Sequence, residues 1–375
     1  MSETIMTVCQ ENQCAGCMAC VNTCSQGAIT IQMQAMKYNA VIQQNLCVNC
    51  GACHKVCPQN NLPNLCEPVS WYQGWSANDE IRKRGTSGGL AGAIAVRFIE
   101  TGGIVYSCFY QDGEFTFGSA TNVDDVKKFA GSKYVKSNPR DCYKEIKDYL
   151  KTGRKVLFIG LPCQVAGIKN YCGRKYDDML FTIDLICHGT PSPILLETFL
   201  NQYGYSLDEL KDVRFRTKSN VQVYEGYKGI ITNGVSDRYL IAFLNSLSYT
   251  ENCYQCRFAR RERVSDITLG DSWGSELSKE ETQRGLSLIL CMTEKGHNLV
   301  KESNLELKPV DLQRAIANNH QLEAPSVKPA GYDAFCEGIS QGKEFNRLVT
   351  KYLRKPCFRQ DVKEILIKMK LIRGG

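Results

Sequence analysis

The sequence predicts an α/β protein that is preceded by a small α+β module and followed by a short helical tail. The first 66 residues are rich in cysteine, and between about residues 100 and 300 apolar runs of strand length alternate with helical segments. The last 25 residues are strongly basic and have no strand pattern. Functional groups gather at the carboxyl ends of strands in α/β sheets, so residues that directly follow a strand are the first candidates for a site.

The composition is that of an ordinary globular protein. Of the 375 residues, 43% are hydrophobic and 23% are charged, and the length allows roughly two to three domains. The N-terminus lacks the basic region and apolar core of a signal peptide, and no apolar run approaches the roughly 18 residues of a membrane span. We therefore expect a cytoplasmic protein whose twenty cysteines stay reduced. The net charge of +7 does not indicate nucleic acid binding, since most Lys and Arg residues alternate with acidic ones.

The most specific pattern in the chain is a duplicated cysteine spacing between Cys14 and Cys57. Each copy reads Cys-x2-Cys-x2-Cys-x3-Cys, which is the pattern of a bacterial two-cluster ferredoxin. Three cysteines of one copy hold one [4Fe–4S] cluster, and the fourth, carried away on a short helix, binds the other cluster. The alternatives are zinc knuckles or a disulfide framework, but zinc sites usually group cysteines in pairs with longer gaps. We expect one cluster on Cys14, Cys17, Cys20 and Cys57, and the second on Cys47, Cys50, Cys53 and Cys24.

A turn-rich linker at residues 62–68 follows this ferredoxin module. Three aromatic residues come next, Trp71, Tyr72 and Trp75, and we expect them to pack one domain against the next rather than to bind a ligand. Cys9 lies outside both cysteine motifs, and we expect it to play no part in cluster binding.

A glycine-rich segment, residues 82–89, leads into an apolar helix that begins near Leu90. Thr86 and Ser87 suit the N-cap of this helix, and the glycines that follow leave room for close backbone approach. Free N–H groups at a helix start form a ready anion site, for which a diphosphate is the natural occupant. A plain helix cap is the alternative.

Strands alternate with helices from about residue 103 onwards. We expect strands at residues 103–110, with a hairpin to 115–118, and then at 155–160, 179–186, 213–216, 224–232, 266–270 and 285–292. We expect helices at residues 90–99, 123–130, 141–151, 165–171, 238–247 and 295–305, and another that starts at Pro193. The last 25 residues read as a basic amphipathic helix, which is either a solvated face or a contact for a partner or a membrane surface.

A third group of cysteines stands in predicted loops. Cys163 and Cys187 each follow a predicted strand, while Cys253 and Cys256 form a Cys-x2-Cys pair. Four thiolates suit either a structural zinc or a third [4Fe–4S] cluster, and beside two other clusters we favour the cluster. His188 could touch a cofactor or could be structural. The remaining cysteines of this part read as ordinary thiols: Cys108, Cys142, Cys172, Cys291, Cys336 and Cys357.

Six motifs in the second part of the chain together indicate a known family. They are residues 84–89, 131–137, 160–167, 184–189 and 266–274 and the pair Cys253 and Cys256. From about residue 70 to 320 the chain resembles the coenzyme F420 hydrogenase/dehydrogenase beta-subunit family, preceded by the family's common ferredoxin module. This resemblance divides the chain into a ferredoxin domain (1–66), an FAD-binding oxidoreductase domain (67–320) and a basic helical C-terminal tail (321–375).

The resemblance implies an α/β flavin-binding core that moves electrons between iron–sulfur clusters and a two-electron partner. In characterised members the partner is the deazaflavin coenzyme, and in a plant relative it is a hydroxymethyl group on a chlorophyll side chain. Lys133 would stabilise the reduced flavin anion, and His188 would be the second catalytic residue. The FAD diphosphate would lie on Thr86, Ser87, Gly88 and Gly89, and the isoalloxazine pocket would be lined by Ser132, Lys133, Tyr134 and Ser137.

The sequence therefore predicts an FAD- and iron–sulfur-dependent oxidoreductase that acts on a small organic molecule, with ferredoxin or another redox protein as its partner. The alternative is an electron-relay subunit without a substrate of its own, as in the ferredoxin-fused relatives found among bacterial surface-polysaccharide genes. A scaffold with vestigial clusters is disfavoured by the complete ligand sets. No G-x-G-x-x-G motif follows a strand, which argues against a direct NAD site.

Overall fold

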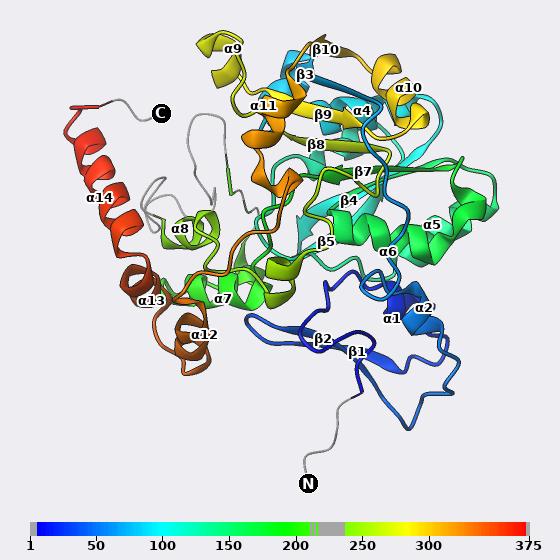
Figure 1. Ribbon diagram of the computed structural model, residues 1–375, viewed down its shortest axis with the longest axis horizontal. Coiled ribbons are helices and arrows are strands. Elements are labelled where there is room, and N and C mark those ends of the chain that lie inside the picture. The colour runs from blue at the N-terminus through cyan, green and yellow to red at the C-terminus, as the bar shows by residue number, and fades with distance from the viewer. Residues whose placement is uncertain (1–5, 211–212, 214, 217–236, 373–375) are drawn as a thin grey trace.

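The computed structural model describes residues 6–210, 213, 215–216 and 237–372. Within these residues the main element is an eight-stranded mixed sheet in the order β10-β3-β9-β8-β7-β6-β4-β5 (Figure 1). Strands β4, β6, β7 and β8 are parallel, and β5, β9, β3 and β10 join antiparallel. The predicted α/β core is confirmed. The strands are β3 (Ser70–Ser76), β4 (Ile104–Gln111), β5 (Glu114–Ala120), β6 (Val156–Gly160), β7 (Leu180–Leu185), β8 (Ile267–Asp271), β9 (Ser287–Cys291) and β10 (Leu305–Lys308).

The two faces of the central strands belong to different cores. In β6, Leu157 and Ile159 pack with the helices of one face, whereas Val156 and Phe158 pack with those of the other. Because both faces are covered, every residue of β6 is buried, and such a strand reads as a continuous apolar run in the sequence. The first face carries α4 (Leu90–Glu100) and α10 (Glu294–Glu302), and the second carries α5 (Cys142–Lys151) and α6 (Pro162–Cys172).

The cysteine-rich N-terminal part folds as a two-stranded antiparallel sheet with two short helices (Figure 1). Each helix follows a residue in the left-handed conformation, Met18 in the first copy and Gly51 in the second, so the two cysteine loops turn in the same way. This part packs against α6, and its apolar side chains join those of α5 and α6 in one core. Its elements are α1 (Ala19–Thr23), β1 (Ile29–Met33), β2 (Tyr38–Ile42) and α2 (Ala52–Val56).

A helical layer lies beside the carboxyl edge of the sheet and is built around aromatic side chains. Phe199, Tyr239 and Phe345 from three different helices meet there, with ring centroids 5.6–6.2 Å apart. Only α14 runs outward along the edge of the molecule (Figure 1). The predicted C-terminal tail thus begins with helices that are packed into the body. The layer comprises α7 (Pro193–Asn201), α8 (Arg238–Leu244), α12 (Tyr332–Ser340), α13 (Phe345–Tyr352) and α14 (Arg354–Lys368).

Some predicted elements differ in the structure. The aromatic run that was expected to be a domain contact forms β3, with Tyr72 beside Ile289 of β9 inside the sheet. The helix expected at 123–130 is a short 3-10 helix, η1 (Asp124–Phe129), and residues 213, 215 and 216 form no strand. The strand expected at 224–232 lies outside the described residues. The remaining helices are α3 (Asp79–Arg84), α9 (Lys279–Gln283) and α11 (Leu312–Ala317), and no helix of the described residues is long and apolar enough to cross a membrane.

Candidate functional site

The first predicted cysteine set is gathered at one small cavity. Cys14, Cys17 and Cys20 come from the first loop and α1, and Cys57 comes from the end of α2. All four are buried, and burial raises the pKa of the Cys17 and Cys20 thiols, with neighbouring thiols adding to the effect. Soft thiolate donors of this kind suit iron–sulfur clusters, and a bound metal deprotonates such thiols outright. The donor set therefore fits the predicted cluster.

A fifth thiol, Cys9, lines the same cavity. Its side chain is hydrogen-bonded to Cys14 and to Cys57, and these bonds lower the pKa of both of them, that of Cys57 to about 7. The sequence analysis assigned Cys9 no part in cluster binding because it lies outside the repeated spacing. Its position next to two predicted ligands arises from the packing of the N-terminal segment on β2, where the Val8 N–H donates to Ala40 O.

The second cysteine set lies nearer to the surface. Burial raises the pKa of the Cys53 thiol, and Cys24 and Cys47 are close enough to raise it further. Cys50 is exposed, and the Asn49 N–H donates to Cys47 Sγ at 3.4 Å in the same loop. All twenty cysteines of the chain are free thiols, so the disulfide framework considered as an alternative is not formed.

The four cysteines of the third predicted set lie close enough for their charges to interact. Cys163 stands in the first turn of α6, Cys187 follows β7, and the Cys-x2-Cys pair surrounds the end of η5 (Glu251–Gln255). Burial is the main cause that raises the pKa of Cys187, and Cys253, Cys163 and Cys256 all raise it further. Burial also raises the pKa of Cys163 to about 12, with contributions from Cys256 and Cys253.

A buried ion pair fixes the loop that carries Cys256. Arg263 donates to Asp184 Oδ1 of β7 at 3.0 Å and to Phe258 O at 2.7 Å. The side chains of Arg263 and Asp184 are almost fully buried, so this pair ties the loop to the sheet from within. Among the described residues, no three His, Cys, Asp or Glu side chains are arranged to hold a single metal ion.

Helix α6 connects the first and third cysteine sets. A Cβ atom at Gly167 would stand 3.2 Å from Sγ of Cys17, so the first cysteine loop rests directly on this helix. Cys163 precedes Gly167 by four residues, which corresponds to about 6 Å along the helix axis. The two sets are therefore neighbours on one rigid element.

The predicted N-cap of α4 is wrong. Gly89, at φ +80°, is the N-cap residue and makes no side-chain cap, whereas Ser87 Oγ donates to Leu286 O at 2.8 Å. The Gly88 N–H donates to Ser287 Oγ at 2.9 Å, and a Cβ there would stand 2.4 Å from Gly74 O. The glycines thus permit close backbone approach, but the approaching backbone belongs to β3 and β9.

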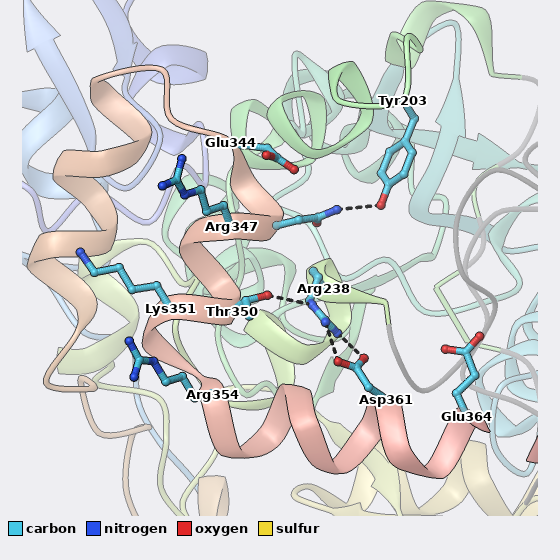
Figure 2. A pocket seen from close by; sticks show the side chains of 10 residues that line it. Tyr203, Arg238, Glu344, Arg347, Thr350, Lys351, Arg354, Asp361 and Glu364 are labelled. Atoms are coloured by element: carbon cyan, nitrogen blue, oxygen red, sulfur yellow. Dashed lines mark hydrogen bonds and ion pairs between the residues drawn. The ribbon is translucent and has the colours of Figure 1, made fainter. Parts of the chain in front are cut away.

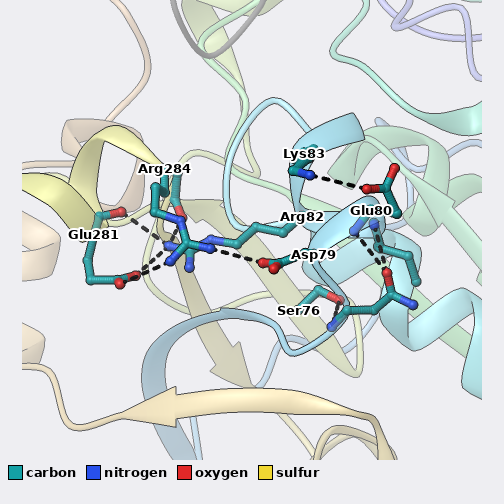
Figure 3. A network of polar contacts seen from close by, with 10 residues as sticks. Ser76, Asp79, Glu80, Arg82, Lys83, Glu281 and Arg284 are labelled. Atoms are coloured by element: carbon teal, nitrogen blue, oxygen red, sulfur yellow. Dashed lines mark hydrogen bonds and ion pairs between the residues drawn. The ribbon is translucent and has the colours of Figure 1, made fainter.

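An ion-pair network holds the segment before this helix start (Figure 3). Buried Arg82 donates to Glu281 Oε2 at 2.8 Å and to Gly285 O at 3.0 Å, and it lies over the Trp75 ring. Arg284 donates to Asp79 at 2.9 Å across the same gap. These contacts join α3 to the chain just before β9, and they fix the direction in which the residues before Gly89 enter α4.

The two predicted flavin-binding segments lie side by side. Thr86 Oγ1 and Ser132 Oγ are 2.9 Å apart and share a hydrogen bond. Tyr134 is stacked on Phe243, with ring centroids 4.3 Å apart, and burial raises the pKa of its hydroxyl while Arg216 opposes this. Ser137 is turned the other way, where its Oγ accepts from Gln164 Nε2 of α6 at 3.0 Å.

Lys133 does not extend into an open pocket. Its Nζ donates to Phe129 O at 2.8 Å and to Ala130 O at 3.0 Å, so the side chain folds back on the preceding 3-10 helix. Its charge also opposes the burial that raises the pKa of Cys108.

The carboxyl ends of β7 and β8 bring together a polar group that the sequence only partly predicts. His188 follows Cys187, and its Nδ1 is 2.8 Å from Gln321 Nε2. Burial lowers the pKa of His188, and His320 lowers it further while Asp271 opposes. Arg216, which the sequence analysis did not single out, donates to Asp271 Oδ2 at 2.5 Å and lies over the half-exposed Trp273 ring. Arg216 also bonds Tyr134, which connects Asp271 to the Thr86–Tyr134 group. His188 lies close enough to this network for the charge of Asp271 to act on it.

Comparison with known proteins decides the family. Residues 71–139 match the N-terminal model of the coenzyme F420 hydrogenase/dehydrogenase beta subunit, residues 153–313 match its C-terminal model, and residues 13–61 match the 4Fe-4S dicluster domain. The chain belongs to the coenzyme F420 hydrogenase/dehydrogenase beta-subunit family. It is thus an iron–sulfur protein of an oxidoreductase family, as the resemblance implied.

Among solved structures, this beta-subunit family member is similar to a chain of the F420-reducing [NiFe] hydrogenase complex from Methanosarcina barkeri. The identity is 21% and the TM-score is 0.48, over 77% of this chain and 94% of that chain. No curated protein matches the chain.

A large cavity of the beta-subunit family protein lies apart from every predicted site residue. It is an open hollow of about 770 Å³ between α8, α13 and α14 (Figure 2). Arg238 donates to both carboxylate oxygens of Asp361 there, each at 2.9 Å, so the best-placed cation of this cavity is neutralised from within. Its lining also contains Tyr203, Glu344, Asn346, Arg347, Thr350, Lys351, Arg354 and Glu364.

Proposed function

We propose that this protein passes electrons between ferredoxin-type [4Fe–4S] clusters and a bound FAD, and thereby reduces or oxidises a small organic molecule or a deazaflavin-type coenzyme. The single observation that carries this proposal is the loop after β7. Cys187 of this loop belongs to the third cysteine set, and the next residue, His188, belongs to the polar network that reaches Thr86. One tight turn of chain thus joins a metal-ligand set to the predicted cofactor pocket.

The three cysteine sets are proposed to hold three clusters. At the third set four thiols lie close enough for their charges to interact, and beside two other clusters we favour iron–sulfur over zinc there. The exposed Cys50 places the second set where ferredoxin or another redox partner could exchange electrons with it.

The flavin would lie against Thr86, Ser132 and Tyr134. A bound flavin accepts electrons one or two at a time and so links one-electron clusters to two-electron chemistry. Thr86 and Ser132 offer hydroxyl groups that share a hydrogen bond, and Tyr134 offers a fixed aromatic face. Ser87 and Gly88 fit less well, because their donors already bond β9, so they shape the helix start rather than hold the diphosphate.

His188 would act as a neutral group beside the substrate. Burial lowers its pKa, so near pH 7 the ring carries one proton, and Gln321 beside Nδ1 fixes how the ring is oriented. Arg216 and Asp271 neutralise one another at the same edge, and the Trp273 ring, over which Arg216 lies, is still 49% exposed. These side chains position a substrate without adding net charge.

The test is anaerobic purification of the full chain followed by cofactor analysis and turnover. We expect about twelve irons per chain, extractable FAD, and oxidation of reduced viologen or ferredoxin when a deazaflavin is supplied. The internal bonds of Ser87 and Gly88 favour a second candidate, an electron-relay subunit that holds no flavin. A preparation that contains iron, binds no added FAD and turns over no small molecule would decide for that relay subunit.

A further inference from the structure

We infer that Lys136 is a shared counter-ion for the first and third cysteine sets, placed so that one buried positive charge stabilises an added electron at either of them. The inference rests on the proposed function, because it assumes that both sets hold redox-active clusters. Lys136 is a positioning residue in this account. It touches the loops that carry the ligands and supplies a fixed charge.

The side chain of Lys136 lies on the loop of the first set. Its Nζ donates to Ala15 O at 3.2 Å, directly between Cys14 and Gly16 in sequence. The lysine Cδ stands 3.3 Å from where a Cβ of Gly16 would be, so the aliphatic stem crosses that glycine closely. The Tyr38 ring covers the ammonium group from the other side at 5.0 Å. Lys136 is only 5% exposed as a result.

The main chain of Lys136 is fixed to the loop of the third set. Its N–H donates at 2.7 Å to Pro191 O, four residues after Cys187. One residue therefore holds the first cysteine loop with its side chain and the third with its backbone. Helix α6 runs beneath both, with Gly167 against Cys17 and Cys163 one turn earlier.

No carboxylate compensates this lysine. Three cationic side chains are buried in the described part of the chain: Arg82, Arg263 and Lys136. Arg82 is paired with Glu281, and Arg263 is paired with Asp184. Among the described residues, Lys136 forms no ion pair, and its side-chain contacts are a carbonyl and an aromatic ring. Because an isolated buried charge is costly, a negative charge is expected beside it.

The thiolates of the two cysteine sets would supply that negative charge. Ala15, which accepts from the ammonium group, is the neighbour of Cys14 in sequence. Ser137, the next residue after Lys136, accepts at 3.0 Å from the side chain of Gln164, the next residue after Cys163. Lys136 therefore lies beside ligand residues of both sets. If both sets hold clusters, reduction by one electron would add one negative charge to the cluster that receives it, with no proton transferred. A cation near both would stabilise the reduced form in either place and so raise both midpoint potentials.

The experiment is an EPR-monitored redox titration of the anaerobically reconstituted full chain. Lys136→Met removes the charge and keeps most of the stem, whereas Lys136→Arg keeps the charge. The matched control is Lys147→Met. Like Lys136, Lys147 donates to a backbone carbonyl and lies over an aromatic ring, and both of these belong to Tyr171. The thiol that the charge of Lys147 influences is Cys172, which belongs to no predicted ligand set.

We expect Lys136→Met to lower the midpoint potentials of two of the three clusters. At a fixed applied potential, the ratio of oxidised to reduced cluster should rise at least tenfold for each of these two. For a one-electron couple this is about 59 mV. The midpoint potential of the cluster on the second cysteine set should not change, because that set lies toward the surface. Lys136→Arg and Lys147→Met should leave all three potentials unchanged. If Lys136→Met loses iron, Lys136→Gln, which can still donate to Ala15 O, replaces it in the same titration.

Unchanged potentials in Lys136→Met with full iron content would overturn the inference. A shift in one cluster alone would also overturn it, since the charge would then not be shared. An iron content of about eight per chain in the unaltered protein is a different result, because it would remove the third cluster and with it that part of the proposed function.

Discussion

Replacing Gly167 by alanine tests the contact between α6 and the first cysteine set. A Cβ atom at this position would stand 3.2 Å from Cβ and Sγ of Cys17 and 3.2 Å from the Tyr143 hydroxyl. Non-bonded carbon atoms prefer about 3.5–4.0 Å, so these neighbours must yield by a few tenths of an ångström. Overpacking costs about 1–3 kcal/mol, while alanine in place of glycine within a helix returns about 1 kcal/mol. We expect a net destabilisation of about 0–2 kcal/mol, concentrated at Cys17.

The assay is chelator-driven iron release from the anaerobically purified chain, followed by the loss of cluster absorbance. If release requires the Cys17 loop to open, a cost of about 1–2 kcal/mol makes opening about five to thirty times more frequent. The control is Gly92→Ala in α4, a helix without cysteine, where the new Cβ would stand 3.1 Å from a methyl group of Ile81. Iron release that is slower in Gly167→Ala than in the unaltered chain, or faster in Gly92→Ala than in Gly167→Ala, would refute the proposed contact.

Three further sites give measurable outcomes. Cys253→Ser should lower the iron content from about twelve to about eight per chain, because only the third set loses a ligand, and an unchanged iron content would count against that set. Thr86→Ala should weaken FAD retention about five- to tenfold through the loss of one hydrogen bond, and unchanged retention would contradict this role. Asp237→Asn keeps the N-cap of α8 but removes a carboxyl whose pKa burial raises to about 7. This folded-state pKa lies above the unfolded value of about 3.9. The unaltered chain should therefore lose stability relative to the variant as pH rises from about 4 to 7, by at most about 4 kcal/mol. A difference in unfolding free energy between the two chains that is the same at pH 5 and pH 8 would refute this.

The fold was predictable where one physical cause dominates. Strands β6, β7 and β9 are covered on both faces or nearly so, and such strands appear as unbroken apolar runs. Strand β3 was missed because Trp71 is exposed while Gln73 is buried, so its pattern resembles neither a buried nor an alternating strand. The sequence there is rich in aromatic residues, and only the antiparallel pairing with β9 and β10 shows that they belong to the sheet.

The site was predictable where ligands are close in sequence. The cysteines of the first two sets lie close together in the sequence, so their spacing could be recognised without a structure. Lys136 was missed because its partner Ala15 lies 121 residues away, and Arg216 because its partner Asp271, at the end of β8, lies 55 residues away. The N-cap prediction failed for another reason. Ser87 has the right chemistry for a cap, but it bonds Leu286 of the neighbouring chain segment, and Gly89 takes the cap position through its left-handed conformation.

Short covalent segments determine the order of the cysteine sets. The two ferredoxin-type sets exchange their fourth cysteines, Cys24 and Cys57, each at the residue that ends a five-residue helix. On helix α6, Cys163 of the third set lies about 6 Å along the helix axis from Gly167, which contacts Cys17 of the first set. The loop after β7 then joins the third set to His188. Exposure differs between the sets: Cys50 of the second set is exposed, the four cysteines of the first set are buried, and those of the third set are partly buried. The second set is therefore where we expect a partner protein to approach, while Lys136 contacts the loops of the other two sets.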